Sequence, residues 1–480
     1  MFRTTLWLTV VTVAGLALGF GREWLLVDAW GAGARTDGFL VALFLPEAIR
    51  MTLAAGLLSS AALPLYQQLD VERRSGWVST QVASVLLTGV LISLVLAVAA
   101  GLWVRLIGPG LAPAAQHTAQ SSLLVLSCVI PMLLLHALAA AVGQAQQRFL
   151  VAGLGSFLYN LPPVLLLLQQ RGASDERSLS WAFVAGAALM LLSVLPLLWR
   201  GGWRPWRWNW RRRDAIDLYA RLGPLLASAG ASQGLVLVER ICASFLGEGA
   251  ITLVNLARKL VNLPLVALMS LNQVVLARMA QLDEDLAARR AALRFGLLLT
   301  AAMTIPAAAG MIGSAPSLVE VLLPSGMQHG PLPMLLAWFA CVIVFGAWNA
   351  LLARYAYAIG NTVLPMRYEL AGSAVNALAL ALVPAVTGIA GIAWAALAGC
   401  LVTALLFLRR YALLGDPLMR RLPVLAMLAL AGAVPLFWLS TGVWLQISAA
   451  ALYALAWLLL LGSWCLRVAR APTVVPAKLT

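Results

Sequence analysis

The sequence carries little charge: only 11% of its 480 residues are Asp, Glu, Lys or Arg, whereas 62% are hydrophobic. A soluble chain has roughly 25% charged residues, because polar groups must cover its surface. This composition excludes an ordinary soluble domain, a disordered chain and a small secreted scaffold. It indicates a protein that lies mostly within a membrane.

Cysteines, histidines and nucleotide-binding signatures are also scarce. The five cysteines are scattered singly in apolar runs without CxxC spacing, and the three histidines lie far apart. This pattern argues against disulfides, a metal site and His-based catalysis. No GxxxxGK[ST] loop is present, so ATP hydrolysis by that route is not expected.

Long apolar segments dominate what is present. A membrane-spanning helix needs about 20 apolar residues at a rise of 1.5 Å per residue. Fourteen segments meet this requirement, and they predict an all-α polytopic membrane protein. Their approximate limits are 4–28, 37–64, 82–107, 121–145, 149–169, 179–199, 218–246, 248–277, 293–323, 333–358, 365–387, 389–408, 422–441 and 444–466.

The net charge of +15 is explained by where the cations lie along these spans. An even number of spans places both termini on one side, and most Lys and Arg residues fall in the loops of that side. The opposite loops hold only Arg35, Arg105, Arg171 and Arg177. Because cytoplasmic loops collect Lys and Arg, both termini are predicted to be cytoplasmic, and nucleic acid is not an expected partner.

A basic linker divides the chain near its middle, at residues 201–217. Residues 199–213 read WRGGWRPWRWNWRRR, in which Arg alternates with Trp. This pattern is typical of a membrane-interface anchor that binds anionic lipids. The alternative is a docking strip for lipid headgroups or for a cytoplasmic enzyme.

Charged residues inside the spans are the strongest functional signal, since each costs roughly 2.5–3.5 kcal/mol at bilayer depth. They gather in spans one and two and in spans seven and eight. The cations predict an anionic substrate, because arginine binds phosphate through paired hydrogen bonds. These cations are Arg22, Arg50, Arg240, Arg258 and Lys259. For Glu23 and Glu239, the alternative is a structural ion pair with the neighbouring Arg.

An internal repeat relates the two charge clusters. A shift of 218 residues places Arg22 on Arg240, Gly31 on Gly249, Asp37 on Asn255 and Pro46 on Pro264. Six spans in each half give both halves the same orientation, which predicts a parallel repeat with a central cavity. The predicted division is an N-terminal lobe at 1–200, the linker, a C-terminal lobe at 218–412, and two appended spans with a tail at 413–480. Pro46 and Pro264 would kink spans two and eight, as in transporter gates.

One segment has a recognisable family pattern. Residues 18–66 read LGFGREWLLVDAWGAGARTDGFLVALFLPEAIRMTLAAGLLSSAALPLY, which resembles the N-terminal signature of the MurJ/MviN flippases. NLARKLVNLP at 255–264 and the stretch 354–411, with AIGNTVLP, are similar to later segments of that family. The resemblance covers most of the chain.

The resemblance implies a transporter of the multidrug/oligosaccharidyl-lipid/polysaccharide exporter superfamily and not an enzyme. Its members flip undecaprenyl-pyrophosphate-linked sugars across the bacterial inner membrane by alternating access, without a cofactor. Membrane potential or an ion gradient, of Na⁺ or H⁺, drives them. The family's essential first-helix Arg falls on Arg22 and its acid on Glu23, the second-helix Asp on Asp37, the first Arg of LRR on Arg50, and the eighth-helix Arg on Lys259.

Coupling and gating residues are expected among the acids of the spans, with one amide as a weaker cation ligand. The set is Glu23, Asp37, Glu47, Glu239 and Asn376. The appended spans would offer the polyprenyl tail a groove facing the lipid, a role that the resemblance implies. A monomer is expected, in contact with membrane lipids and with glycan-synthesis enzymes.

The sequence departs from the family pattern at four positions. These are Leu16, Glu47, Met51 and Ala55, where the peptidoglycan flippases usually carry Arg, Asn, Arg and Glu. Two cationic positions are lost, one acid is lost at Ala55, and one acid is gained at Glu47, near the expected headgroup site. The departures favour an exopolysaccharide repeat unit as cargo. Lipid II, a MATE-like cation or drug antiporter and a non-transporting scaffold are the alternatives.

Overall fold

The computed structural model describes residues 2–54, 56–148, 153–170, 174–204, 210–262, 286–323, 330–359, 361, 363–439 and 442–470. Some sequence predictions fall outside this set. They concern Ala55, residues 205–209 of the basic linker, Pro264 with the second half of span eight, and the end of the C-terminal tail.

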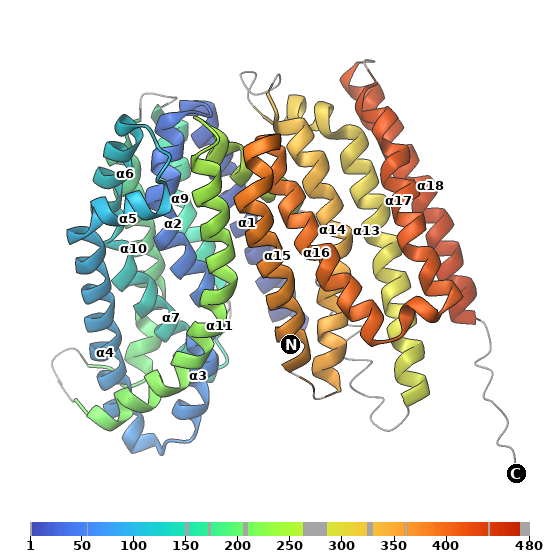
Figure 1. Cartoon of the computed structure of the whole chain (residues 1–480). Coiled ribbons are helices and arrows are strands. Elements are labelled where there is room, and N and C mark those ends of the chain that lie inside the picture. Colours follow the sequence, from blue (N-terminus) through green and yellow to red (C-terminus); the bar gives the residue numbers. More distant parts are fainter. Residues whose placement is uncertain are drawn as a thin grey trace, which may run out of the picture. The chain divides into compact units, whose positions relative to one another are not determined.

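The regular elements of the described residues are all helical (Figure 1), as expected for backbone that must satisfy its hydrogen bonds within each segment in lipid. The first ten helices are α1 (Phe2–Trp30), α2 (Ala34–Ala54), α3 (Leu57–Gln67), α4 (Val71–Val98), α5 (Ala100–Ile107), α6 (Pro113–Leu126), α7 (Val129–Ala145), α9 (Gly155–Gln170), α10 (Glu176–Arg200) and α11 (Arg212–Ser244). Residues 250–262 are helical, and they are followed by α13 (Leu286–Leu322), α14 (Leu332–Ala358), α15 (Val363–Thr387), α16 (Ala390–Arg410), η2 (Leu413–Gly415), α17 (Pro417–Phe437) and α18 (Val443–Arg470).

The predicted polytopic membrane fold is confirmed. Nine helices of the described residues are long and apolar enough to cross a membrane, and two bent pairs, α2 with α3 and α6 with α7, raise the number to eleven. The three predicted spans that remain correspond to α9, which has 16 residues, to α11, and to the helix that starts at residue 250. The architecture therefore agrees with about fourteen spans.

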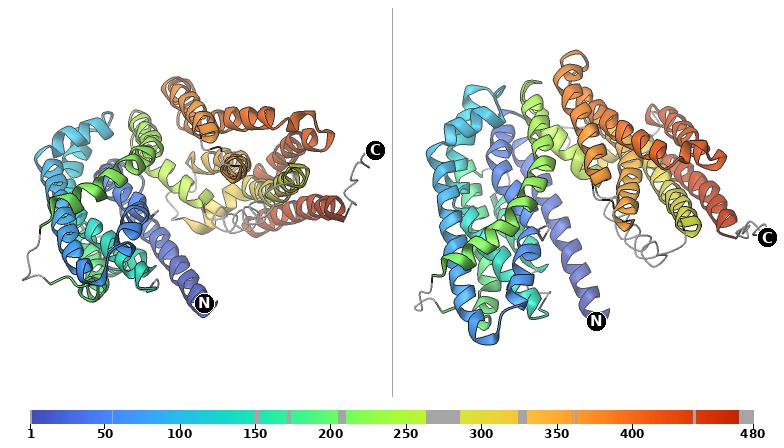
Figure 2. Two further views of the ribbon diagram at one scale, coloured as in Figure 1. Left: turned by 90° about the horizontal axis from the view of Figure 1, so that it is seen from below. Right: turned by 60° about the horizontal axis from the view of Figure 1, so that its bottom comes forward.

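The described chain divides into two compact units, Met1–Thr252 and Leu253–Thr480. In the first unit, α9 packs between α1 and α10, α7 packs on α3, α4 and α10, and α2 packs on α6. In the second, α13 packs against α14, α17 and α18, while α16 packs against α14 and α15. Within each unit most helices run alongside one another (Figure 2). The division into lobes by the internal repeat stays a prediction.

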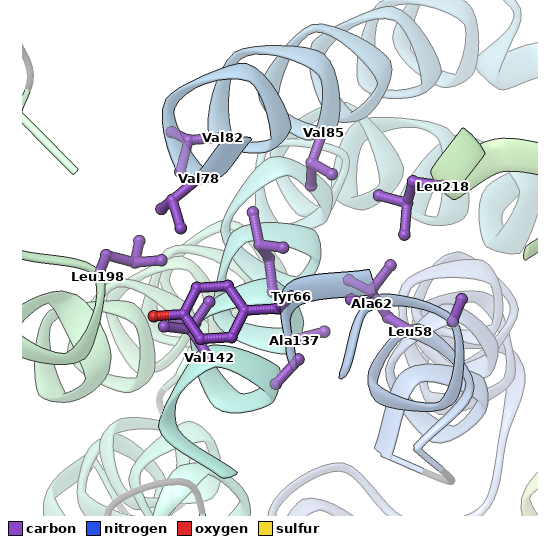
Figure 3. Close-up of a cluster of buried hydrophobic side chains, with 14 of the residues drawn as sticks. Leu58, Ala62, Tyr66, Val78, Val82, Val85, Ala137, Val142, Leu198 and Leu218 are labelled. Carbon is purple, nitrogen blue, oxygen red and sulfur yellow. The ribbon is translucent and has the colours of Figure 1, made fainter. Parts of the chain in front are cut away.

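A buried apolar cluster holds one end of the first unit together (Figure 3). It joins Tyr66 of α3 to Val78 and Val82 of α4, Val142 of α7 and Leu218 of α11. The Tyr219 hydroxyl of α11 also hydrogen-bonds Thr88 Oγ1 of α4, at 2.6 Å. The predicted seventh span is thus anchored to the helices of residues 1–200.

Candidate functional site

Ionisable side chains are buried in the first unit where the sequence predicts a site. Arg22, Glu23, Asp37 and Glu239 are each at most 4% exposed. At bilayer depth such groups require partners, and the partners of each residue define what the site can do.

Arg22 on α1 is held by α9. Its Nη1 donates to Asn160 Oδ1 at 2.8 Å, its Nη2 donates to Glu23, and its guanidinium lies 4.9 Å from the centre of the Phe183 ring. Asn160 is oriented by its own Nδ2, which donates to the Ser156 carbonyl at 2.8 Å. A Cβ on Gly15 would lie 3.2 Å from the backbone nitrogen of Phe157, which is tighter than most real contacts, so this glycine lets α1 approach α9 closely.

Arg50 on α2 is held by its helix neighbour Glu47. Its Nε donates to Glu47 Oε2 at 3.0 Å and its Nη2 donates to Glu47 Oε1 at 2.7 Å, which forms a two-point ion pair between positions i and i+3. The guanidinium also lies 5.1 Å from the centre of the Tyr159 ring, and its Nη1 is 3.4 Å from Ser156 Oγ. Arg22 and Arg50 therefore meet on the same two turns of α9.

Three buried hydrogen-bonding atoms around this place have no partner among the described residues. They are Nε of Arg22, the hydroxyl of Tyr159, and Nε2 of His136 on α7. A buried polar atom without a partner is rare in folded proteins and calls for a ligand or a water molecule. A guanidinium N–H, a phenol and an imidazole can all donate to a phosphate oxygen.

Asp37 caps the helix that begins at residue 250. Its carboxylate accepts hydrogen bonds from the Gly249 and Thr252 N–H groups, at 2.7 and 2.8 Å, and from the Thr252 hydroxyl at 2.6 Å. A carboxylate at a helix N-terminus accepts hydrogen bonds from the free N–H groups there and interacts favourably with the positive end of the helix dipole. Its partners are more than 200 residues away in the chain.

The repeat has a counterpart in the backbone. Gly31, just before α2, has φ +72°, and Gly249, just before the helix at 250, has φ +85°. Both glycines adopt the left-handed conformation that other residues avoid, at positions that the 218-residue shift superimposes.

Arg240 on α11 belongs to the same unit. Its Nη1 donates to the Leu40 carbonyl of α2, and its guanidinium lies 4.7 Å from the centre of the Phe44 ring. Glu23, Asp37, Glu47 and Glu239 all act on Arg240 electrostatically. The first unit thus brings together every site residue that the sequence predicts in spans one, two and seven.

The other predicted site residues lie in the second unit. The Arg258 guanidinium lies 4.9 Å from the centre of the Phe339 ring of α14, and Lys259 follows it in the helix that starts at residue 250. Asn376 of α15 is 6% exposed, and its Oδ1 has no hydrogen-bond partner in the described residues. In the described chain, no group of three His, Cys, Asp or Glu residues is arranged to hold a metal ion.

Sequence reasoning missed the contribution of α9. Ser156, Tyr159 and Asn160 are uncharged, so they did not stand out against the apolar background of span five. A signal existed in the run SFLYNLPP, whose polar residues share a helix face at i, i+3 and i+4.

A small cluster outside the spans anchors the turn between α1 and α2 to the start of α10. The Ser174 carbonyl accepts hydrogen bonds from Trp30 Nε1 at 3.0 Å and from Arg35 Nη2 at 2.9 Å, while Arg35 also pairs with Glu176. Asp175 caps α10, accepting the Ser178 N–H at 3.1 Å. Hydrogen bonding from Ser178 lowers the pKa of the Asp175 carboxyl below its usual value.

Comparisons with known proteins bear on this arrangement. The family model described as lipid II flippase MurJ matches residues 26–461. A probable lipid II flippase MurJ of Vibrio cholerae serotype O1 is 26% identical over 457 residues, covering 89% of this chain and 86% of that protein. The probable lipid II flippase MurJ of Thermotoga maritima is 22% identical over 380 residues and covers 78% of each chain.

Solved structures show the same fold. A lipid II flippase MurJ in an inward closed conformation aligns with a TM-score of 0.84 and 18% identity, covering 96% of this chain and 98% of that chain. An inward-facing multidrug resistance MATE family transporter of the MOP superfamily aligns with a TM-score of 0.65 and 15% identity. The alignment covers 84% of this chain and 96% of that chain.

Proposed function

The chain belongs to the family of the lipid II flippase MurJ, and on that premise we propose that it carries a polyprenyl-pyrophosphate-linked saccharide from the cytoplasmic to the periplasmic leaflet of the bacterial inner membrane. The resemblance seen in its sequence is thereby confirmed, and the protein is a multi-pass membrane transporter of the lipid-linked precursor flippase type. Its orientation, with both termini cytoplasmic, is part of the proposal and rests on the distribution of Lys and Arg.

One observation carries the headgroup site. Arg22 and Arg50 converge on Ser156, Tyr159 and Asn160 of α9, where buried donors lack partners. A pyrophosphate supplies several charged acceptor oxygens on two linked phosphorus atoms, which suits arginine forks and a phenol hydroxyl. In the proposed mechanism Arg50 contacts the pyrophosphate first, because its side chain is the more accessible of the two. Arg22, which is more deeply buried, binds the pyrophosphate afterwards.

Arg240, Arg258 and Lys259 complete the proposed set of cations for the headgroup. Membrane potential then supplies the driving force, because each elementary charge that crosses gains or loses about 2.3 kcal/mol per 100 mV. A potential that is negative inside favours outward movement of an anionic headgroup, and ATP is not needed.

The saccharide has two candidates. Lipid II comes first because the family and the relatives described above carry that name. An exopolysaccharide repeat unit is the second candidate, favoured by Glu47 and Met51, which change the chemistry beside Arg50 relative to the family pattern. The same pyrophosphate site serves either cargo, since the two differ in the sugar.

The test is a flipping assay with the full chain in proteoliposomes, supplied in parallel with lipid II and with a lipid-linked exopolysaccharide unit. We expect one of them to become accessible on the opposite face, and Arg50→Ala to abolish this movement. Arg105→Ala removes an exposed arginine of α5 and is the matched control, which we expect to leave flipping unchanged. Flipping by Arg50→Ala at the wild-type rate would refute the headgroup site, and no movement of either lipid would favour a non-transporting scaffold.

A further inference from the structure

Glu47 occupies the position on Arg50 that a substrate phosphate would need. Two parallel N–H···O bonds join the Arg50 guanidinium to the Glu47 carboxylate, at 3.0 and 2.7 Å. Guanidinium groups recognise phosphate through the same two-point geometry. A carboxylate three residues away on one helix is therefore a built-in substitute for the phosphate of the cargo.

Without substrate, the three buried arginines of the site, Arg22, Arg50 and Arg240, already lie beside enough acids to compensate their charge. Arg22 forms an ion pair with Glu23, and Arg50 forms one with Glu47. Arg240 is attracted electrostatically by Glu239 and Asp37. Balanced charges lower the cost of carrying them at bilayer depth. An added phosphate would meet no net positive charge unless one of these acids were neutralised.

We propose that Glu47 competes with substrate phosphate for Arg50, and that Glu47 takes up one proton when phosphate replaces it. The proton, taken from water, adds to one Glu47 oxygen, and the Arg50 N–H donors then point to a phosphate oxygen. The charge of the pair rises from zero to +1, which matches one negative charge of the phosphate. This inference rests on the proposed function, because it assumes that Arg50 receives the headgroup.

Glu47 fits this role better than Glu23 because its side chain is more accessible. The Glu47 side chain is 25% exposed, whereas the Glu23 side chain is 3% exposed. The ionisable groups that act on Glu47, or on the arginines beside it, come from α2 itself and from α1, α7, α9 and α11. They are Arg50 on its own helix, Arg22 and Glu23 of α1, His136 of α7 beside Arg50, Tyr159 of α9, and Glu239 and Arg240 of α11.

The test measures binding of farnesyl pyrophosphate to the full chain in nanodiscs between about pH 5 and pH 8, with farnesol as the probe that lacks phosphate. A tethered group competes at an effective concentration of millimolar or more. We therefore expect Glu47→Gln to bind the probe at least about tenfold more tightly at the alkaline end. Wild-type affinity should rise as pH falls, while the variant should keep only the slope due to the probe and the other groups.

A matched control is Glu72→Gln, which removes an exposed acid from the first turn of α4 and should bind as the wild type does. Glu47→Asn, which restores the residue usual in the family, is the second variant if Glu47→Gln misfolds on gel filtration. Unchanged affinity and an unchanged pH slope in the Glu47 variants would overturn the inference. Arg50→Ala separates the two claims: if it loses binding while the Glu47 variants match the wild type, the proposed function stands and this inference fails. Wild-type binding by Arg50→Ala would refute both.

Discussion

Asp37 and Thr252 are joined by two hydrogen bonds, from the backbone N–H at 2.8 Å and from the hydroxyl at 2.6 Å, to the same carboxylate oxygen. The pair links the start of the predicted second span to the start of the predicted eighth. Both residues are fully or almost fully buried, so water cannot replace either partner cheaply. Asp37 therefore has a structural role in this conformation, in addition to any part in gating.

Asp37→Ala is expected to destabilise the protein. It removes a helix cap and leaves two buried N–H groups and a hydroxyl unsatisfied, each of which costs roughly 1–3 kcal/mol. The midpoint temperature of thermal unfolding of the purified chain should fall clearly. The midpoint of Asp37→Asn should fall less, because the side-chain oxygen of Asn can still accept a hydrogen bond from these donors. Asp28→Ala removes an exposed acid of α1 and should leave the midpoint unchanged. Equal midpoints for Asp37→Ala and Asp28→Ala would show that the cap contributes nothing.

A second prediction concerns the contact between α2 and α6. A Cβ on Gly38 would lie 2.5 Å from the Ala115 carbonyl oxygen, closer than real Cβ atoms approach. Gly38→Ala should therefore force the helices apart and lower the free energy of unfolding by roughly 1–3 kcal/mol. Gly21→Ala is the control, since no atom lies within 4 Å of its added Cβ and alanine favours a helix. Thermal unfolding of the two variants side by side tests the contact, and a Gly38→Ala midpoint at or above that of Gly21→Ala would contradict it.

Local physics made the spans predictable from the sequence. The apolar length of the segments was enough to locate them, since a helix must satisfy its own backbone in lipid. The 218-residue shift pairs Gly31 with Gly249, and both have a left-handed backbone, while the repeat itself stays a prediction. The pairing of Arg22 with Glu23 and of Arg50 with Glu47 could also be anticipated, because the partners are close in sequence.

Contacts between distant segments could not be predicted. The partners of Asp37 lie beyond a sequence separation of 200 residues, and no periodicity encodes such a distance. Asn160 was missed because an uncharged polar residue costs little once it is bonded. Tyr159 was missed because a single aromatic residue does not stand out in an apolar span. Charged residues made α1, α2 and α11 recognisable as site helices in the sequence. The helix that contacts them, α9, contributes only uncharged polar residues and was therefore not recognised.

The cap on α10 predicts a pH effect outside the membrane spans. Because Ser178 lowers the pKa of Asp175 in the folded state, the capping contribution is fully present above the unfolded value of about 3.9. It is lost as the pH falls through the lower pKa of the folded state. An Asn at position 175 can still cap the helix but does not titrate. The midpoint temperatures of thermal unfolding of the wild type and of Asp175→Asn, measured from about pH 6 down to pH 3, should therefore converge at the acidic end. Because Asp175 is exposed, the difference should be small, and parallel curves would argue against the cap.

The ion pair between Arg22 and Glu23 permits a test that separates architecture from transport. Arg22→Leu removes the ion-pair partner of the buried Glu23 carboxylate, which Arg240 still attracts, so the loss should stay below the roughly 3–5 kcal/mol of a buried charge left with no compensation. The double variant Arg22→Leu, Glu23→Leu removes both charges and should recover most of this loss, while Asn160 still lacks its guanidinium donor. If Arg22 contacts the pyrophosphate, the double variant stays inactive in the flipping assay although its unfolding midpoint is restored. Recovery of flipping together with stability would show that the pair is purely structural and would remove Arg22 from the headgroup site.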